Sequence, residues 1–216
     1  MLIDAVEWLG HSGFRVRAGR TTIYIDPYRI ADAAPRADLI LVTHGHYDHF
    51  SPRDIQGISD GKTWLIAPAA VAERVGGRVV SIAPGEVVEP EFAHGVAVRA
   101  VAAYNTSKRD ADGKLFHARE ARWVGYDLNV RGERLYHAGD TDVIPEMDEV
   151  TGVDVALLPV SGTYVMTAEE AAEAARRIQP RLAVPMHWGQ HLGTKADARR
   201  FSELAPVPTA IMDPVP

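Results

Sequence analysis

The feature that most constrains this sequence is a short apolar run, residues 39–43, that ends directly on a cluster of histidines and an aspartate. An almost wholly apolar run of this length predicts a β-strand that is covered on both faces. The polar side chains that follow it therefore lie at the carboxyl end of a buried strand. The cluster reads His44-Gly45-His46-Tyr47-Asp48-His49.

The composition of the cluster predicts a metal site. In an extended or tightly turned segment, the side chains of His44 and His46 point to the same side, so both imidazoles can bind one ion. Asp48 and His49 follow where the backbone turns. Four ligands are too many for one tetrahedral ion with an open position, but they suit two adjacent ions. A lone histidine at a strand end is more often only hydrogen-bonded, and the clustering reverses those odds.

Two later strand ends supply further candidate ligands. His137-Ala138-Gly139-Asp140-Thr141 follows one of them and His187 follows the other. We expect Asp140 to bridge the two ions and His187 to complete the second ion. His137 could support Asp140, or it could satisfy backbone groups at the end of its strand.

Composition narrows the chemistry and the partners. The chain has no cysteine, so any metal must be held by nitrogen and oxygen, and zinc is expected, with manganese or iron as alternatives. A net charge of −6 opposes binding to nucleic acid and favours a small-molecule substrate. No leader or membrane-spanning run is visible, which predicts a cytoplasmic protein without a membrane partner. The sequence does not indicate an oligomeric state.

The 216 residues suit one compact domain, residues 1–216, of mixed α/β class. Capping patterns predict helices that begin after Ser51, Thr167 and Thr194, and residues 69–74 are compatible with a helix. A charged stretch without periodicity, residues 106–122, predicts a functional loop or lid. Strands are expected at residues 3–8, 13–17, 22–26, 39–43, 63–67, 79–83, 96–102, 123–130, 134–137, 153–160 and 182–185.

A His-x-His-x-Asp-His run after an apolar strand resembles the signature of the metallo-β-lactamase superfamily. The resemblance extends over Trp8-Leu9-Gly10-His11-Ser12 and Ile25-Asp26-Pro27, together with residues 43–49, 136–141 and 184–189. It looks most like the branch that contains ascorbate-phosphate lactonase-like and uncharacterised metal-dependent hydrolases. This resemblance implies a four-layer αββα sandwich, with His44 and His46 on the first ion and with Asp48, His49 and His187 on the second. Asp140 matches the bridging aspartate of the family.

One position departs from the family pattern. Asn105 stands where a third histidine for the first ion is usual. Three outcomes stay open: Asn105 is a weak ligand, His117 of the lid substitutes, or no protein group takes that place.

In the implied mechanism, a water between the ions becomes a hydroxide and attacks the substrate. Asp48 is expected to bind the second ion and to orient this nucleophile. Candidates for the acid that protonates the leaving group are His11, Tyr164 and His191. For His11, a buried hydrogen-bonded ring at a turn is an equally good interpretation.

Other residues are candidates for binding the substrate. Tyr104, Tyr164 and Trp188, together with His117, could line a pocket beside the metals, although core packing is the commoner role of such aromatic residues. Basic residues of the lid could receive an anion, or they could belong to a solvated loop. These basic residues are Lys108, Arg109, Lys114, Arg119 and Arg122.

The leading hypothesis is a hydrolase of a small phosphoester, phosphodiester or lactone. A non-catalytic or regulatory metal-binding protein is the first alternative, and Asn105 is the observation that favours it. A nucleic-acid-processing hydrolase is the second alternative, which the acidic charge opposes.

Overall fold

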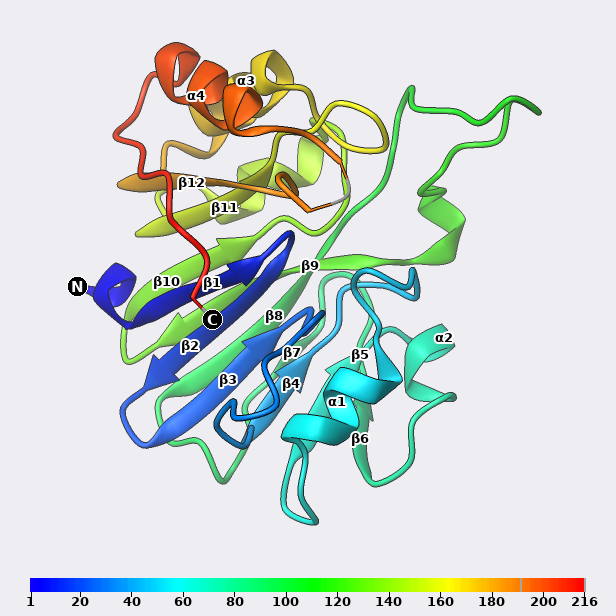
Figure 1. Cartoon of the computed structure of the whole chain (residues 1–216), viewed down its shortest axis with the longest axis vertical. Helices are drawn as coiled ribbons and strands as arrows, with labels where there is room; N and C mark the ends of the chain where they lie inside the picture. The colour runs from blue at the N-terminus through cyan, green and yellow to red at the C-terminus, as the bar shows by residue number, and fades with distance from the viewer. Residues whose placement is uncertain (191, 216) are drawn as a thin grey trace.

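Two β-sheets packed face to face form the centre of the computed structural model, which describes residues 1–190 and 192–215 (Figure 1). The first sheet contains, in spatial order, β1 (Val6–Gly10), β2 (Gly13–Ala18), β3 (Thr21–Ile25), β4 (Leu39–Leu41), β5 (Trp64–Ala67) and β6 (Arg78–Ser81). The second contains β12 (Leu182–Met186), β11 (Val155–Pro159), β10 (Glu133–His137), β9 (Val124–Val130), β8 (Val96–Ala102) and β7 (Val87–Val88).

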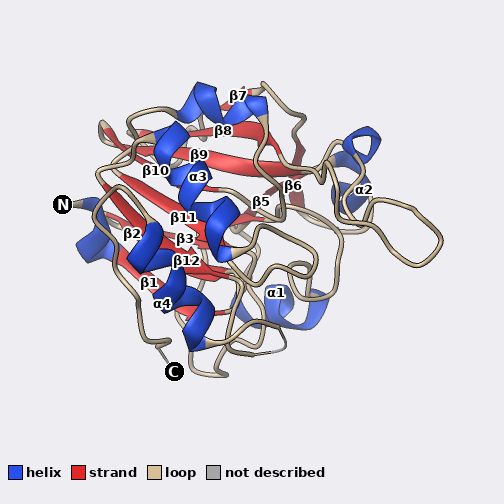
Figure 2. Cartoon of the chain, turned by 90° about the horizontal axis from the view of Figure 1, so that it is seen from above, coloured by secondary structure: helices blue, strands red, loops and turns tan. Residues whose placement is uncertain are grey.

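Helices cover the outer faces of both sheets (Figures 1 and 2). The side chains of β4 alternate, because Leu39 and Leu41 belong to the core between the sheets, whereas Ile40 packs with residues of α1 and α2. The expected αββα order is therefore confirmed. The first sheet is covered by α1 (Pro52–Ile58) and α2 (Ala69–Ala72), and the second by α3 (Ala168–Ile178) and α4 (Lys195–Leu204).

Because of the strand directions, most candidate ligands lie at one edge of the sandwich. Strands β3, β4 and β5 are parallel to one another, and so are β10, β11 and β12. The carboxyl ends of parallel strands meet at one edge of a sheet, and the chain segments that follow them lie side by side there. The segments after β3, β4, β10 and β12 carry most of the candidate ligands and their supports.

Most expected elements are present, and the helices after Ser51, Thr167 and Thr194 begin at the predicted caps. The first strand is a correction. Residues Leu2–Ala5 form a 3₁₀ helix before β1, because the amide of Asp4 binds the carbonyl of Met1 at 3.1 Å and its carboxylate binds the N-terminal ammonium. The sequence patterns also missed short elements, namely β7 and the 3₁₀ helices Arg119–Ala121 and Pro145–Val150.

The lid predicted at residues 106–122 projects from the sheets at the upper right of Figure 1. It is folded back on itself, since Arg109 and Leu115 form an isolated antiparallel bridge. Across residues 1–190 and 192–215, no helix has the length and apolar character needed to span a bilayer.

Candidate metal centre

The loop between β4 and α1 holds four candidate ligands in a tight turn. The amides of His49 and Phe50 both bind the carbonyl of His46, at 3.1 and 2.8 Å. This turn places Nε2 of His44 only 3.1 Å from Nδ1 of His46. The prediction that these two rings face one point therefore agrees with the geometry.

His117 of the lid completes this first group. Its ligand atom lies within 4.8 Å of those of His44 and His46, so the three imidazoles surround one space. Trp123 forms the wall of that space, with its ring centroid 4.9 Å from that of His44 and 4.8 Å from that of His46. The sequence patterns did not single out Trp123.

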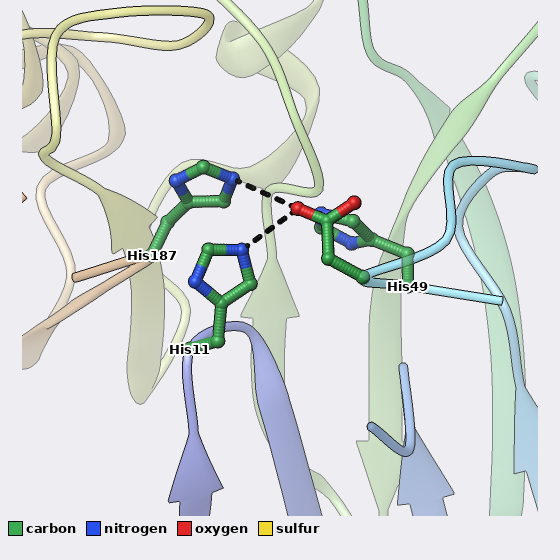
Figure 3. Close-up of side chains that lie close together, drawn as sticks. His11, His49 and His187 are labelled. Carbon is green, nitrogen blue, oxygen red and sulfur yellow. Dashed lines mark hydrogen bonds and ion pairs between the residues drawn. The ribbon is translucent and has the colours of Figure 1, made fainter. Parts of the chain in front are cut away.

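A second group consists of Asp48, His49, His187 and His11. Figure 3 shows the rings of His11 and His187 directed at one carboxylate oxygen, with the ring of His49 behind that carboxylate. Oδ2 of Asp48 lies 3.0 Å from Nε2 of His11, 3.8 Å from Nε2 of His49 and 4.0 Å from Nε2 of His187. His11 therefore lies inside the site and contacts Asp48 directly.

Asp140 lies between the two groups. Its Oδ2 is 3.2 Å from Nε2 of His117 and 3.3 Å from Nε2 of His187, and its Oδ1 is 3.2 Å from Nε2 of His49. The turn that leads to it needs Gly139, whose φ is +64° and whose added Cβ would meet the carbonyl of Val124 at 2.8 Å. Asp140 thus has the position that a bridging ligand requires.

Two of the histidines hold a strained backbone. His11 and His187 have φ values of 52° and 59°, a region that costs a non-glycine residue roughly 1–2 kcal/mol. The amide of His187 donates to the carbonyl of His11 at 2.8 Å, and their ring centroids are 4.0 Å apart. Strain of this kind collects at functional sites because surrounding contacts must hold it in place.

A single carboxylate supports two histidines of the loop after β4, His44 and His49. Asp26, which follows β3, accepts from Nδ1 of His49 at 2.7 Å and from the hydroxyl of Thr43 at 2.6 Å. That hydroxyl can then accept from Nδ1 of His44, which lies 3.0 Å away. The sequence interpretation assigned no function at the site to Asp26 or Thr43, although both lie in segments that carry the family resemblance.

The later segments have supports of their own. Nδ1 of His187 lies 2.8 Å from the hydroxyl of Ser161. His137, in contrast, binds the carbonyl of Ser12 and the amide of Gly139, so it satisfies backbone groups. This geometry agrees with the second of the two roles considered for His137.

Asn105 faces His117, and its side-chain amide forms hydrogen bonds with His117, Asp142 and Tyr164. Its Oδ1 lies 2.8 Å from Nδ1 of His117. Of the three outcomes left open by the sequence, this geometry favours the one in which His117 substitutes for the usual histidine.

Burial and the neighbouring charges shift the pKa values of Asp140 and His49 in opposite directions. Burial lowers the pKa of His44 well below its usual value, and it lowers the pKa of His11 to about 4. Burial also disfavours a charge on Asp140 and on His49. Nevertheless, His187 and His49 hold the pKa of Asp140 well below its usual range, and Asp140 together with Asp26 raises the pKa of His49 well above its own.

Several inward-facing atoms are buried without a hydrogen-bond partner among the described residues. They are Nε2 of His49, His117 and His187, together with Oδ1 of Asp140. His49 donates a hydrogen bond from Nδ1 to Asp26, and His117 donates one from Nδ1 to Asn105, so the Nε2 atom of each ring, which faces Asp140, can bind a cation in place of a proton. Extra protons on the rings would gather several positive charges in one buried space. A divalent cation satisfies the same atoms together, so the residues fit a metal.

The aromatic side chains predicted to line a pocket contact residues other than the candidate ligands. Tyr104 donates to Glu146 at 3.0 Å, and Trp188 donates to the carbonyl of Pro185 at 3.0 Å and packs on Trp8. Both rings are therefore held by contacts outside the two ligand groups. Tyr164 packs on Phe116 of the lid, with ring centroids 4.6 Å apart. His191 lies outside the described residues.

Two of the five basic residues of the lid have acidic partners. Lys108 pairs with Glu170 at 2.6 Å and with Asp142 at 3.3 Å, and Arg119 pairs with Glu146 at 2.8 Å. These pairs weaken the interpretation that the lid receives an anion. In the loop between β4 and α1, Tyr47 is the only large apolar residue that is well exposed, with an exposed fraction of 67%.

Comparison with known proteins identifies the family. The β-lactamase superfamily domain matches residues 5–187. A UPF0173 metal-dependent hydrolase of Thermoplasma volcanium is 32% identical over 93% of this chain and 90% of its own length. Its counterpart from Pyrococcus abyssi is 34% identical over 92% and 91%.

Solved structures agree with this match. A Parabacteroides distasonis protein superposes with a TM-score of 0.83 at 29% identity, over 97% of this chain and 93% of that one. Igni18, a metallo hydrolase of Ignicoccus hospitalis, gives 0.78 at 21% identity over 98% and 95%, which supports the fold. The chain therefore belongs to the β-lactamase superfamily and, within it, to the UPF0173 family of metal-dependent hydrolases.

Proposed function

We propose that this protein holds two divalent cations and hydrolyses a small phosphoester, phosphodiester or lactone. The observation that carries the proposal is the convergence of three buried imidazole Nε2 atoms on the carboxylate of Asp140. Imidazole and carboxylate ligands suit zinc, and they also suit iron and manganese. Zinc is the metal that we propose first.

The residues divide into two ligand sets with one shared member. We assign His44, His46 and His117 to the first ion. Asp48, His49 and His187 are assigned to the second ion, and Asp140 is assigned to both.

When bound, the two cations supply the Lewis acidity that activates water and polarises a substrate oxygen. The chain's own residues orient the reacting groups. His11 is neutral because burial lowers its pKa to about 4, and its ring donates from Nε2 to Oδ2 of Asp48 at 3.0 Å. This hydrogen bond fixes the carboxylate of Asp48 beside His49 and His187. We propose that His11 is a hydrogen-bond donor to Asp48 and that Asp48 orients the nucleophile.

The test is metal analysis of protein purified without added metal, followed by assays on phosphoesters, phosphodiesters and lactones with zinc, manganese and iron. We expect two ions per chain and metal-dependent cleavage of at least one substrate class. His117→Ala should lose one ion and Asp140→Ala should lose both. His94→Ala is the matched control, because His94 is exposed and lies outside both groups. Full metal content in folded Asp140→Ala would contradict the proposed ligand set.

The same experiment separates the alternatives. A non-catalytic metal-binding protein was suggested because Asn105 stands where a ligand is usual. The position of His117 beside His44 and His46 weakens this reason. Two bound ions without cleavage of any panel member would restore that alternative. A nucleic-acid substrate is disfavoured by the net charge of −6, and salt-sensitive RNA binding would restore it.

A further inference from the structure

We infer that Asn105 is a positioning residue for His117, and that Asp142 holds Asn105 in the orientation this role requires. The inference rests on the proposed function, because it takes His117 as a ligand of the first ion. It concerns a question that the ligand set leaves open, namely how a long lid presents a ligand with the accuracy that a metal site needs.

The amide of Asn105 has a partner in each direction. Its Oδ1 accepts from the backbone amide of His117 at 2.9 Å and from Nδ1 of the same residue at 2.8 Å. Its Nδ2 donates to Oδ1 of Asp142 at 3.0 Å and to the carbonyl of Tyr164 at 2.9 Å. A backbone amide only donates, and a carbonyl or ionised carboxylate only accepts. These partners therefore fix which end of the Asn105 amide is oxygen.

The orientation of this amide determines the tautomer of His117. Since Oδ1 of Asn105 carries no proton, Nδ1 of His117 must donate, which leaves the lone pair of Nε2 available. Nε2 lies 3.2 Å from Oδ2 of Asp140, at the centre of the site. The backbone amide of Asn105 also donates to the carbonyl of His117 at 2.7 Å, so backbone and side chain hold the ligand together. Asn105 thus acts on the ion through His117.

Asp142 connects this clamp to the start of the lid. Its Oδ2 accepts from the amides of Thr106 and Ser107 at 2.7 and 3.0 Å. Its Oδ1 binds Asn105 and lies 3.3 Å from the ammonium of Lys108. Asp142 is almost fully buried, with 2% of its surface exposed. One carboxylate on the segment after β10 therefore fixes both the base of the lid and the residue that orients His117.

The first measurement uses metal-free protein and reads the tautomer of His117 from long-range ¹H–¹⁵N NMR spectra. We expect Nδ1–H in the wild type and a mixture with Nε2–H in Asn105→Ala. The rings of His44 and His49 should keep their tautomers, because Thr43 and Asp26 support them. A merely structural role of Asn105 would not shift the tautomer of one ring selectively. An unchanged Nδ1–H tautomer in folded Asn105→Ala would overturn the inference.

The second measurement is the affinity of each ion, by competition with a zinc chelator. Loss of a residue that orients a ligand typically costs about 10- to 100-fold in metal affinity. We expect this loss at one ion only in Asn105→Ala. Thr106→Ala is the matched control, because it removes one hydroxyl contact to Asp142, at 3.1 Å, and leaves Asn105 in place. Equal affinity of both ions in Asn105→Ala and wild type would overturn the inference.

Asp142→Asn provides a second variant if Asn105→Ala does not fold. The amide oxygen of the substituted side chain can still accept from the lid backbone, but its NH₂ group would then face Nδ2 of Asn105, donor against donor. We expect a smaller loss of affinity at the same ion, and no loss would overturn the inference. His117→Ala separates this inference from the proposed function. If His117→Ala keeps both ions the ligand set is wrong, and if it loses one while Asn105→Ala loses none, only the positioning role is wrong.

Discussion

The two sides of the candidate metal centre are built in different ways. On one side, four candidate ligands occupy positions 44 to 49 in a single turn after β4, and Asp26 supports the rings of His44 and His49. On the other side, His117, Asp140 and His187 come from three separate segments, and Asn105 supports the first histidine while Ser161 supports the second. We refer to these as the loop side and the distributed side.

This difference determines whether a substitution on each side should weaken the binding of one ion or of both. On the loop side, one carboxylate orients two rings, and one of these contacts passes through Thr43. A change at Asp26 should therefore disturb both ions. On the distributed side, each support orients one ligand, so a change there should disturb one ion. Asp140 is the exception, because it contacts histidines from both groups.

The largest effect is expected for Asp140→Ala. The substitution removes the only carboxylate that approaches both ligand groups within the described residues, so neither ion should be retained. Loss of metal activation typically removes several kcal/mol of transition-state stabilisation, and about 4 kcal/mol corresponds to a fall of about 1,000-fold in kcat/KM. Metal analysis and steady-state kinetics give the answer. Retention of one ion would show that the two sides are independent.

Removal of the metal should destabilise the distributed side more than the loop side. Ligand binding at about 1,000 times Kd contributes about 4 kcal/mol, which is about 8–16 °C in Tm for a chain of this size. Hydrogen exchange locates the change. The amide of Thr43 keeps its bond to Asp26 at 2.8 Å, whereas the lid loses the ion that His117 is proposed to bind. A larger increase in the exchange rate on metal removal in residues 39–43 than in residues 106–118 would contradict the comparison.

The loop side was visible in the sequence for a physical reason. Its four candidate ligands lie within six positions, and the buried strand before them is marked by an unbroken apolar run, so periodicity and spacing were sufficient to find it. Asp140 and His187 were found because each follows a strand of the same kind. The four-layer fold followed from the family resemblance to these motifs.

The remaining parts of the site depend on contacts that spacing does not encode. Asn105 and His117 are 12 positions apart, and the intervening lid has no periodicity, so only the folded chain shows that the two side chains meet. Asp26 was part of the recognised pattern, but its bonds to Thr43 and His49 cross between strands. Trp188 was a candidate for the pocket, and its contact with Trp8 across the fold places it in the core.

An intermediate effect is expected for Asp26→Asn. The amide would replace a carboxylate that accepts from the backbone and hydroxyl of Thr43 and from His49. Hydrogen bonds to charged groups contribute about 1.5–3 kcal/mol each, so we expect a loss of about 2 kcal/mol in the free energy of unfolding. Both ions should bind about 10- to 100-fold more weakly. Denaturant unfolding and chelator competition measure the two effects, and weakening of only one ion would break the comparison.

The smallest effect is expected for Ser161→Ala, which removes the hydroxyl 2.8 Å from Nδ1 of His187. A neutral hydrogen bond contributes about 0.5–1.5 kcal/mol, and water can replace this hydroxyl because Ser161 is half-buried. The strained backbone of His187 stays fixed by its amide bond to His11, so the ring keeps most of its orientation. The second ion should therefore bind about tenfold more weakly at most, with the first ion unchanged. Chelator competition tests this expectation, and a loss as large as that of Asp26→Asn would mean that a single-ligand support on the distributed side matters as much as the shared carboxylate.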